Sequence, residues 1–169
     1  ETGGPLNAVY TVTPTSNPEG CVGNPFVITV PVNPEPVLNP SLDVTVCSDV
    51  RTNIVLSTNG LSVPAAVFNI VNITVAGGLT PAAGNSSIQN GVNANAILND
   101  RFTNTTNGSL TVEYTIVPVS AQGCLGAPAV VVVTVDPEPV LDPALSPLPA
   151  CSDVTTGVLL AVAPGSAPA

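Results

Sequence analysis

The chain repeats itself with a period of about one hundred residues. The stretch YTVTPTSNPEGCVGNP, which begins at Tyr10, returns as YTIVPVSAQGCLGAP from Tyr114. Tyr114 follows Tyr10 by 104 residues, Cys124 follows Cys21 by 103, and Cys151 follows Cys47 by 104. Such a period is the size of a small domain and is too long for a solenoid repeat. The sequence therefore predicts a tandem array of small domains.

The repeat divides the chain into three parts. We expect residues 1–33 to be the C-terminal hairpin of one repeat, residues 34–136 to be a complete repeat, and residues 137–169 to be the N-terminal part of a following repeat. We therefore expect each repeat to have the neighbouring repeats of the same chain as its first partners.

Alternation of apolar and polar residues, which is typical of a half-buried strand, is clearest in the copied segments. The residues expected to face inward are Leu110, Val112, Tyr114 and Ile116 in one copy, and Leu6, Ala8, Tyr10 and Val12 in the other. A second strand follows in each copy, over residues 25–32 and 128–135. Pro31 favours an edge or bulge position because it lacks a backbone donor. Each pair of strands predicts a hairpin.

Further short strands are expected inside the complete repeat, at residues 43–46, 53–57, 66–75, 86–89 and 103–104, with one helical turn near residues 94–98. The 19 Pro and 14 Gly residues punctuate these apolar runs with turns. Seven or so strands in a hundred residues predict an all-β fold, a β-sandwich of the immunoglobulin type.

A proline-rich linker also repeats, as NPEPVLNP from Asn33 and DPEPVLDP from Asp136. Alternate prolines hold the backbone extended and biased toward polyproline II, so each linker is a stiff spacer. We therefore expect a semi-rigid rod of β-sandwich repeats joined by Pro-rich linkers.

The charge excludes several classes of function. Eleven acidic residues face only two basic ones, Arg51 and Arg101, which gives a net charge of −9. This balance argues against binding nucleic acid or an anionic membrane surface, and no apolar run is long enough to span a bilayer. The chain has no His, which excludes a Ser–His–Asp site and a histidine zinc site within it. We predict no enzyme and no catalytic or cofactor-binding residue.

Four cysteines allow three complete pairings. The repeat favours Cys47–Cys124 within one unit, with Cys21 and Cys151 joined to partners outside this chain segment. The alternative pairs Cys21 with Cys47 and Cys124 with Cys151. Each of these disulfides would cross-link the segments on the two sides of a linker. Free or buried thiols are the third interpretation.

Acidic residues gather at and just after the linkers. They are Glu35, Asp43, Asp49, Asp136, Glu138, Asp142 and Asp153. Calcium takes six to eight oxygen ligands, often from several carboxylates, but this spacing matches no defined calcium loop. Solvated acids are the preferred interpretation, and a calcium site is the alternative. Four Asn-x-Ser/Thr triplets, at Asn72, Asn85, Asn104 and Asn107, are expected to mark surface.

The motifs Y-T-[VI]-x-P, G-C-x-G, V-[ND]-P-x-P and C-S-D recur here in order. Together they resemble the PKD-like repeats of giant Bacteroidetes cell-surface proteins. The resemblance implies a secreted protein exported by the type IX pathway, similar to adhesins linked to gliding motility and cell attachment. It implies no catalytic residue.

Two functions follow as hypotheses. The first is a structural repeat of a long cell-surface fibre or adhesin that projects a binding region and mediates attachment to surfaces or other cells. Low charge would also let identical chains associate in a filament. The alternative is a glycan-binding accessory module. Sugar binding relies on exposed aromatic side chains, and this chain has no Trp and two Tyr, both expected to face inward, which favours the fibre.

Overall fold

The computed structural model describes residues 4–143, 149 and 151–168, and every regular element within them is a β-strand. The strands in chain order are β1 (Leu6–Val12), β2 (Phe26–Val32), β3 (Val44–Cys47), β4 (Ala65–Val75), β5 (Leu79–Pro81), β6 (Gln89–Val92), β7 (Phe102–Asn104), β8 (Leu110–Ser120) and β9 (Ala129–Asp136). The all-β fold that the sequence predicts is confirmed.

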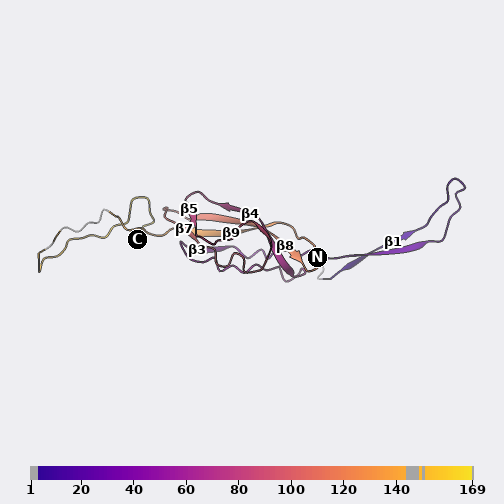
Figure 1. Ribbon diagram of the computed structural model, residues 1–169, viewed down its shortest axis with the longest axis horizontal. Helices are drawn as coiled ribbons and strands as arrows, with labels where there is room; N and C mark the ends of the chain where they lie inside the picture. Colours follow the sequence, from indigo (N-terminus) through magenta and orange to yellow (C-terminus); the bar gives the residue numbers. More distant parts are fainter. Residues whose placement is uncertain (1–3, 144–148, 150, 169) are drawn as a thin grey trace.

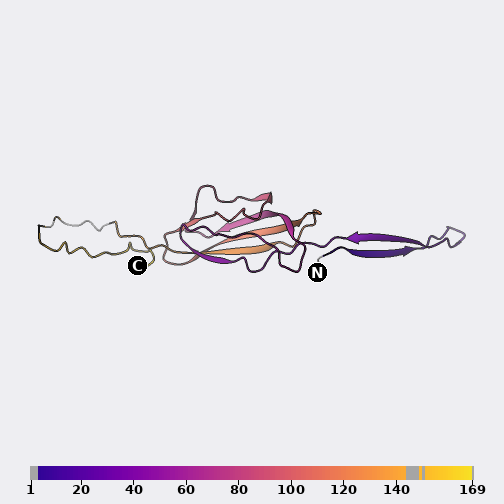
Figure 2. The same ribbon diagram turned by 90° about the horizontal axis from the view of Figure 1, so that it is seen from below.

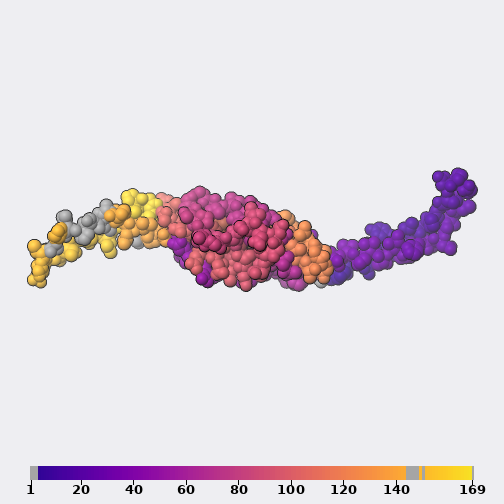
Figure 3. Space-filling model, viewed as in Figure 1, coloured from indigo at the N-terminus to yellow at the C-terminus, as the bar shows by residue number. Residues whose placement is uncertain are grey.

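The chain forms three parts arranged along one line, of which two contain strands (Figure 1). Strands β1 and β2 form a separate hairpin that projects from one end of the central body, and the segment after Asp136 leaves from the opposite end (Figure 2). The body contains a five-stranded sheet in the order β3-β9-β8-β4-β6 and a two-stranded sheet, β5-β7. The molecule is therefore long and narrow, with its hairpin and its C-terminal segment far apart (Figure 3).

The β8–β9 hairpin supplies the centre of the core. Residues with period-two spacing on the two strands face one side of the sheet, and six of them are at most 1% exposed: Val112, Tyr114, Ile116, Val131, Val133 and Val135. Opposite pairs such as Tyr114 and Val131 share this face because side chains at one antiparallel register position point the same way. The inward-facing assignment for this copy is confirmed.

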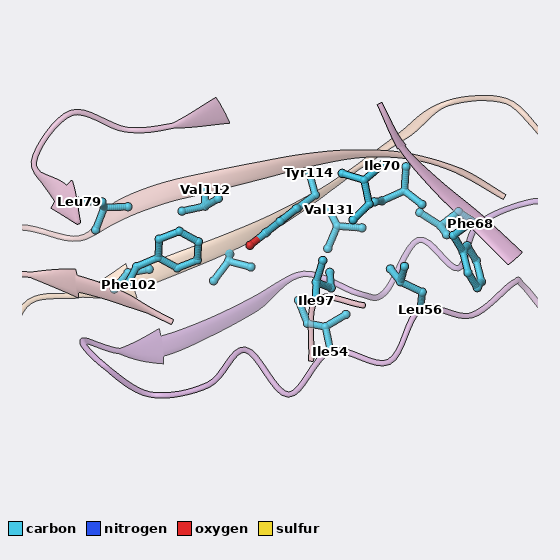
Figure 4. Packing of buried hydrophobic residues seen from close by; sticks show 14 residues of the cluster. Ile54, Leu56, Phe68, Ile70, Leu79, Ile97, Phe102, Val112, Tyr114 and Val131 are labelled. Carbon is cyan, nitrogen blue, oxygen red and sulfur yellow. The ribbon is translucent and has the colours of Figure 1, made fainter. Parts of the chain in front are cut away.

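An irregular second layer covers this face (Figure 4). Residues 51–57 contribute the buried side chains of Thr52, Ile54 and Leu56, but this segment does not form the strand predicted at residues 53–57. Their backbone donors bond instead to the loop after β6, from Asn53 N to Leu98 O at 3.0 Å and from Leu56 N to Ala94 O at 2.8 Å. The sequence predicted a strand at residues 53–57, but it could not indicate that the hydrogen-bonding partner of this segment would be a loop.

The middle of the body departs from the prediction in two other ways. Strand β5 was not expected, and β6 lies a few residues beyond the predicted 86–89. Residues 93–100 form successive turns rather than a helical turn. Their hydrogen bonds join residues three positions apart, such as the Ala96 N–H and the Asn93 carbonyl oxygen at 3.2 Å. Here Asn, Ser and Gly dominate, and local side-chain bonds compete with regular structure.

The β1–β2 hairpin repeats the register of β8–β9. Leu6 pairs with Val32 and Tyr10 with Ile28, as Leu110 pairs with Val135 and Tyr114 with Val131. Its matching face is open, however: Tyr10 is 56% exposed, whereas Tyr114 is 1% exposed. The expectation that Tyr10 faces inward is therefore wrong for this structure, because no second layer covers the hairpin. Pro31 lies in a two-stranded sheet, where every strand is an edge, as its missing donor predicted.

We expect Ile116→Ala to lower the free energy of unfolding of the body by about 2–5 kcal/mol, because it leaves a cavity among well-packed side chains. Urea denaturation followed by far-ultraviolet circular dichroism measures this change. Val130→Ala, in which a 52% exposed side chain on β9 is shortened, is the control and should cost less than about 0.5 kcal/mol. Similar losses in both variants would contradict the assignment of the core.

Candidate functional site

The first linker is built into the body. Pro36 and Leu38 are buried, and the Val37 N–H donates to Ser62 Oγ at 2.9 Å. The backbone at Gly126, in the turn between β8 and β9, lies so close that a Cβ there would clash with the Pro36 carbonyl oxygen. The second half of the linker is therefore fixed to one end of the sandwich.

The second linker is tied to the opposite end of the body through Asn104. The Glu138 N–H donates to the Asn104 carbonyl at 3.0 Å, and Asn104 Nδ2 donates to Val135 O at 2.8 Å and Gly108 O at 2.9 Å. The Asn104 N–H donates to Ser48 Oγ at 2.8 Å. Asn104 is fully buried, so the expectation that its glycosylation triplet marks surface is wrong for this residue.

Between these two ends, the first and last strands of the body are parallel neighbours. Val44 pairs with Val133 and Cys47 with Asp136. At the end of this pair of strands, the Ser48 N–H donates to the Asp136 carbonyl oxygen at 2.9 Å. At its beginning, Asp43 Oδ1 accepts a bond from the Val132 N–H at 2.8 Å. The chain therefore enters the body through one strand of this pair and leaves it through the other.

A buried tyrosine–aspartate bond fastens the long loop before β7. Tyr114 OH donates to Asp100 Oδ2 at 2.7 Å, and Asp100 Oδ1 accepts from the N–H and the hydroxyl of Ser86 at 2.9 Å and 3.1 Å. Burial raises the pKa of the Tyr114 phenol above its ordinary range, and the hydrogen bond to Asp100 and that group's charge raise it further. The phenol is therefore held neutral as a structural donor.

The acidic residues proposed for calcium are placed along the body rather than in one cluster. Asp43 bonds the β9 backbone, Asp49 accepts from Thr103 Oγ1 at 2.6 Å, and Asp136 accepts from Ser109 Oγ at 2.6 Å. Glu35 belongs to the first linker, whereas Glu138 and Asp142 belong to the second. Among the residues that the structure describes, no three Cys, Asp or Glu side chains are grouped so as to hold a metal ion.

All four cysteines are free thiols, and the structure does not bring the proposed Cys47–Cys124 pair together. Cys47 lies beside Asp136 at one end of β9, and Cys124 precedes the other end of that strand. The eight residues of β9 alone span more than about 20 Å, whereas a disulfide needs Cα atoms within about 7 Å.

The alternative pairs are separated as well. The loop that carries Cys21 lies at the free tip of the hairpin, far from the end of the body where Cys47 lies (Figure 2). Cys124 lies at the hairpin end of the body, and Cys151 belongs to the segment that leaves from the other end (Figure 1). Sequence spacing could not show at which ends of the strands the cysteines lie.

A shallow depression of about 510 Å³ opens beside β4 and β6. Its lining includes amides and hydroxyls from Asn85, Ser86, Gln89 and Asn93 above an apolar floor that includes Val67 and Ile70. No carboxylate, thiol or basic group lines it, so it offers hydrogen bonds but no acid or base that would activate its serine hydroxyls. No sequence motif predicted this depression, because its lining comes from separate segments of the chain.

The chain matches the PKD-like domain family over residues 2–36 and 44–139, and it belongs to that family. No curated protein and no solved structure matches the chain. PKD-like domains are typically non-catalytic modules of extracellular proteins. In the described part of the chain, no helix has the length and apolar character needed to cross a membrane.

Gly126→Ala tests how the first linker is fixed. The added methyl group would overlap the Pro36 carbonyl, so we expect a loss of about 1–3 kcal/mol in the free energy of unfolding, together with easier proteolysis near Pro36. Gly77→Ala is the matched control, because nothing lies within 4 Å of its added Cβ. Equal stability of the two variants would contradict the close contact.

The Tyr114 bond predicts a specific loss of stability in alkali. Because the folded-state pKa of this phenol is raised, its contribution is complete below the unfolded value of about 10 and is lost as the pH rises beyond it. We expect the free energy of unfolding to fall by up to about 1.4 kcal/mol per pH unit above about pH 10. Tyr114→Phe should flatten this slope and Tyr10→Phe should keep it, as urea titrations between pH 8 and pH 12 would show.

Proposed function

We propose that this chain is a load-bearing repeat of a secreted bacterial cell-surface fibre, which projects a binding region and mediates attachment to surfaces or other cells. The PKD-like family supports the coarser part of this proposal, an extracellular structural or adhesion-type module. The resemblance of its motifs to giant Bacteroidetes surface proteins supports export by the type IX pathway and a link to gliding motility.

The parallel pairing of β3 with β9 is the observation that carries the proposal. A tensile force reaches the body through the beginning of β3 and leaves through the end of β9, so it pulls two parallel neighbours in opposite directions. The bonds between them then bear the force together in shear, instead of opening one at a time. The Asp43–Val132 hydrogen bond at one end of the β3–β9 pair and the Ser48–Asp136 hydrogen bond at the other would bear this shear force together with the bonds between the strands.

The fixed linkers support the same function. The first linker is bonded to the body at Val37 and the second at Glu138, so each leaves little free chain between the force and the parallel strands. Their prolines make the remaining residues stiff. Repeats joined in this way would hold a binding region at a distance from the cell surface.

A glycan-binding accessory module is the second candidate, and the polar depression beside β4 and β6 is the observation that favours it. Amides and hydroxyls are suitable partners for sugar hydroxyls. No aromatic side chain lines the depression, however, whereas sugar sites commonly use an aromatic platform. The fibre therefore accounts for more of the structure.

Force spectroscopy of the chain, held between marker domains at its two ends, tests the load-bearing role. Asp43→Ala removes one bond, worth about 1 kcal/mol, from the sheared set, so we expect it to unfold about fivefold faster at a given force. Glu113→Ala is the control, because it removes the same charge from an exposed position on β8. Equal unfolding rates for the two variants under force would contradict the proposal.

A further inference from the structure

Three Asn-Gly dipeptides occur in the chain, at Asn59-Gly60, Asn90-Gly91 and Asn107-Gly108. In this dipeptide an asparagine side chain reacts with the backbone that follows it, because glycine has no side chain to hinder the approach of its nitrogen. The structure holds the three dipeptides in different ways. It therefore predicts which of them reacts.

The reaction consumes one water molecule and releases ammonia, with no oxidant or reductant. The glycine N–H loses its proton, its nitrogen forms a bond to the asparagine Cγ, and the Cγ–Nδ2 bond breaks to release ammonia. Water then opens the resulting succinimide at one of its two carbonyl carbons. One opening gives aspartate. The other gives isoaspartate, in which the main chain runs through Cβ and Cγ and is longer by one carbon atom.

Asn90 is protected by a hydrogen bond to the neighbouring strand. The Gly91 N–H donates to Oδ1 of Asn69, a residue of β4, at 2.8 Å. Because this bond stabilises the protonated amide, loss of the proton that begins the reaction becomes less favourable. Asn90 and Gly91 also belong to β6, and its pairing with β4 restricts movement of the nitrogen toward the side chain.

Asn59 is held by bonds of its own side chain. Its Oδ1 accepts from the Ser62 N–H at 2.8 Å and from the Leu61 N–H at 3.3 Å. Its backbone N–H donates to the Val37 carbonyl oxygen at 2.9 Å. The side chain is therefore fixed as the acceptor of a tight turn, and it would have to give up these bonds to turn its Cγ toward the Gly60 nitrogen.

Asn107 lies in the loop between β7 and β8, where Asn107, Gly108 and Ser109 are all exposed. The Gly108 N–H donates to Thr106 Oγ1 at 3.5 Å, which is longer than an ordinary hydrogen bond. A Cβ added at Gly108 would meet nothing within 4 Å, so there is open space around this residue. The attacking nitrogen is therefore less restrained here than at Gly91.

We propose that Asn107 is a site of spontaneous deamidation, and that the isoaspartate formed there loosens the attachment of the second linker to the body. The Gly108 carbonyl oxygen accepts from Asn104 Nδ2 at 2.9 Å and from Thr106 Oγ1 at 3.0 Å. A longer main chain before Gly108 displaces this oxygen from its two donors. Asn104 then loses one of the bonds that hold it, and its carbonyl oxygen is the acceptor for the Glu138 N–H.

Peptide mapping of the full chain during incubation in mildly alkaline buffer tests the first part of the proposal. Trypsin cleaves the unfolded chain after Arg51 and Arg101, so residues 102–169, which contain Asn107, separate from residues 52–101, which contain the other two Asn-Gly dipeptides. Mass spectrometry detects the replacement of an amide by a carboxylic acid, and an isoaspartyl methyltransferase labels isoaspartate. We expect Asn107 to react at least about tenfold faster than either other asparagine.

Two variants connect the rates to the structure. Gly108→Ala leaves room for its added Cβ, and it should slow deamidation of Asn107 at least about tenfold, because the methyl group hinders the attacking nitrogen. Asn69→Ala removes the acceptor of the Gly91 N–H and should make Asn90 react about tenfold faster. Unchanged reactivity of Asn90 would contradict its protection by this bond.

Asn59 provides the internal control for Asn69→Ala, since it lies in the same tryptic peptide and far from the lost bond in sequence. Its rate should stay unchanged. Faster reaction of both asparagines would show general loosening of the body instead, and thermal unfolding followed by circular dichroism would then show a lowered midpoint.

Hydrogen exchange measured by nuclear magnetic resonance tests the second part. The Glu138 amide should exchange at least about threefold faster in the aged chain than in the fresh chain. Asn107→Gln retains an amide but cannot form the five-membered ring, so its exchange at Glu138 should not change with age. Asn107→Asp carries the charge of the product without the longer main chain, and it should exchange like the fresh chain.

Either of two results would overturn the proposal. One is deamidation of Asn107 no faster than that of Asn59 and Asn90, which would show that the fold does not select among the three dipeptides. The other is an aged chain with isoaspartate at Asn107 and unchanged exchange at Glu138, which would show that the modification does not reach the linker.

Discussion

The inner face of the β8–β9 hairpin has to be kept from water, and the rest of the body is arranged around that requirement. Alternate residues on both strands make one side apolar, and neither strand can cover itself. Strands β3 and β4 extend the sheet on either side, while residues 51–57 and the turns near Ile97 cover the apolar face of the sheet. The same face on β1–β2 has no such cover in this structure, and its side chains are exposed.

Hydrogen bonds of buried side chains then hold the loops that hydrophobic burial alone does not fix in one conformation. Asp100 receives the Tyr114 hydroxyl and two donors from Ser86, and Asn104 joins β9, the loop before β8 and the second linker. No buried side-chain nitrogen or oxygen among the described residues lacks a hydrogen-bond partner. Buried polar groups that are fully bonded favour one arrangement of the irregular layer over its alternatives. Through Asn104 they also tie the second linker to its end of the body.

The candidate site was only partly visible in the sequence. The repeated linker motif and the first and last strands were predicted, because each depends on residues close together in the chain. The roles of Gly126, Asp43 and Asn104 were not, because each acts on a partner brought close only by folding. The structure does not bring Cys47 and Cys124 together for the same reason: the repeat indicates their spacing, but strand direction places them toward opposite ends of β9.

The sequence alone determined the spacing of its repeated motifs, the strands with strict alternation, the recurrence of the proline-rich motif and the lack of histidine. These properties are local or compositional, so they need no knowledge of neighbours in space. The tertiary structure decided which strands are parallel, that residues 51–57 pair with a loop instead of a sheet, and that two identical patterns can be buried in one place and open in another. Burial depends on what lies across the core, and period-two alternation marks a side chain's face without saying what will cover it.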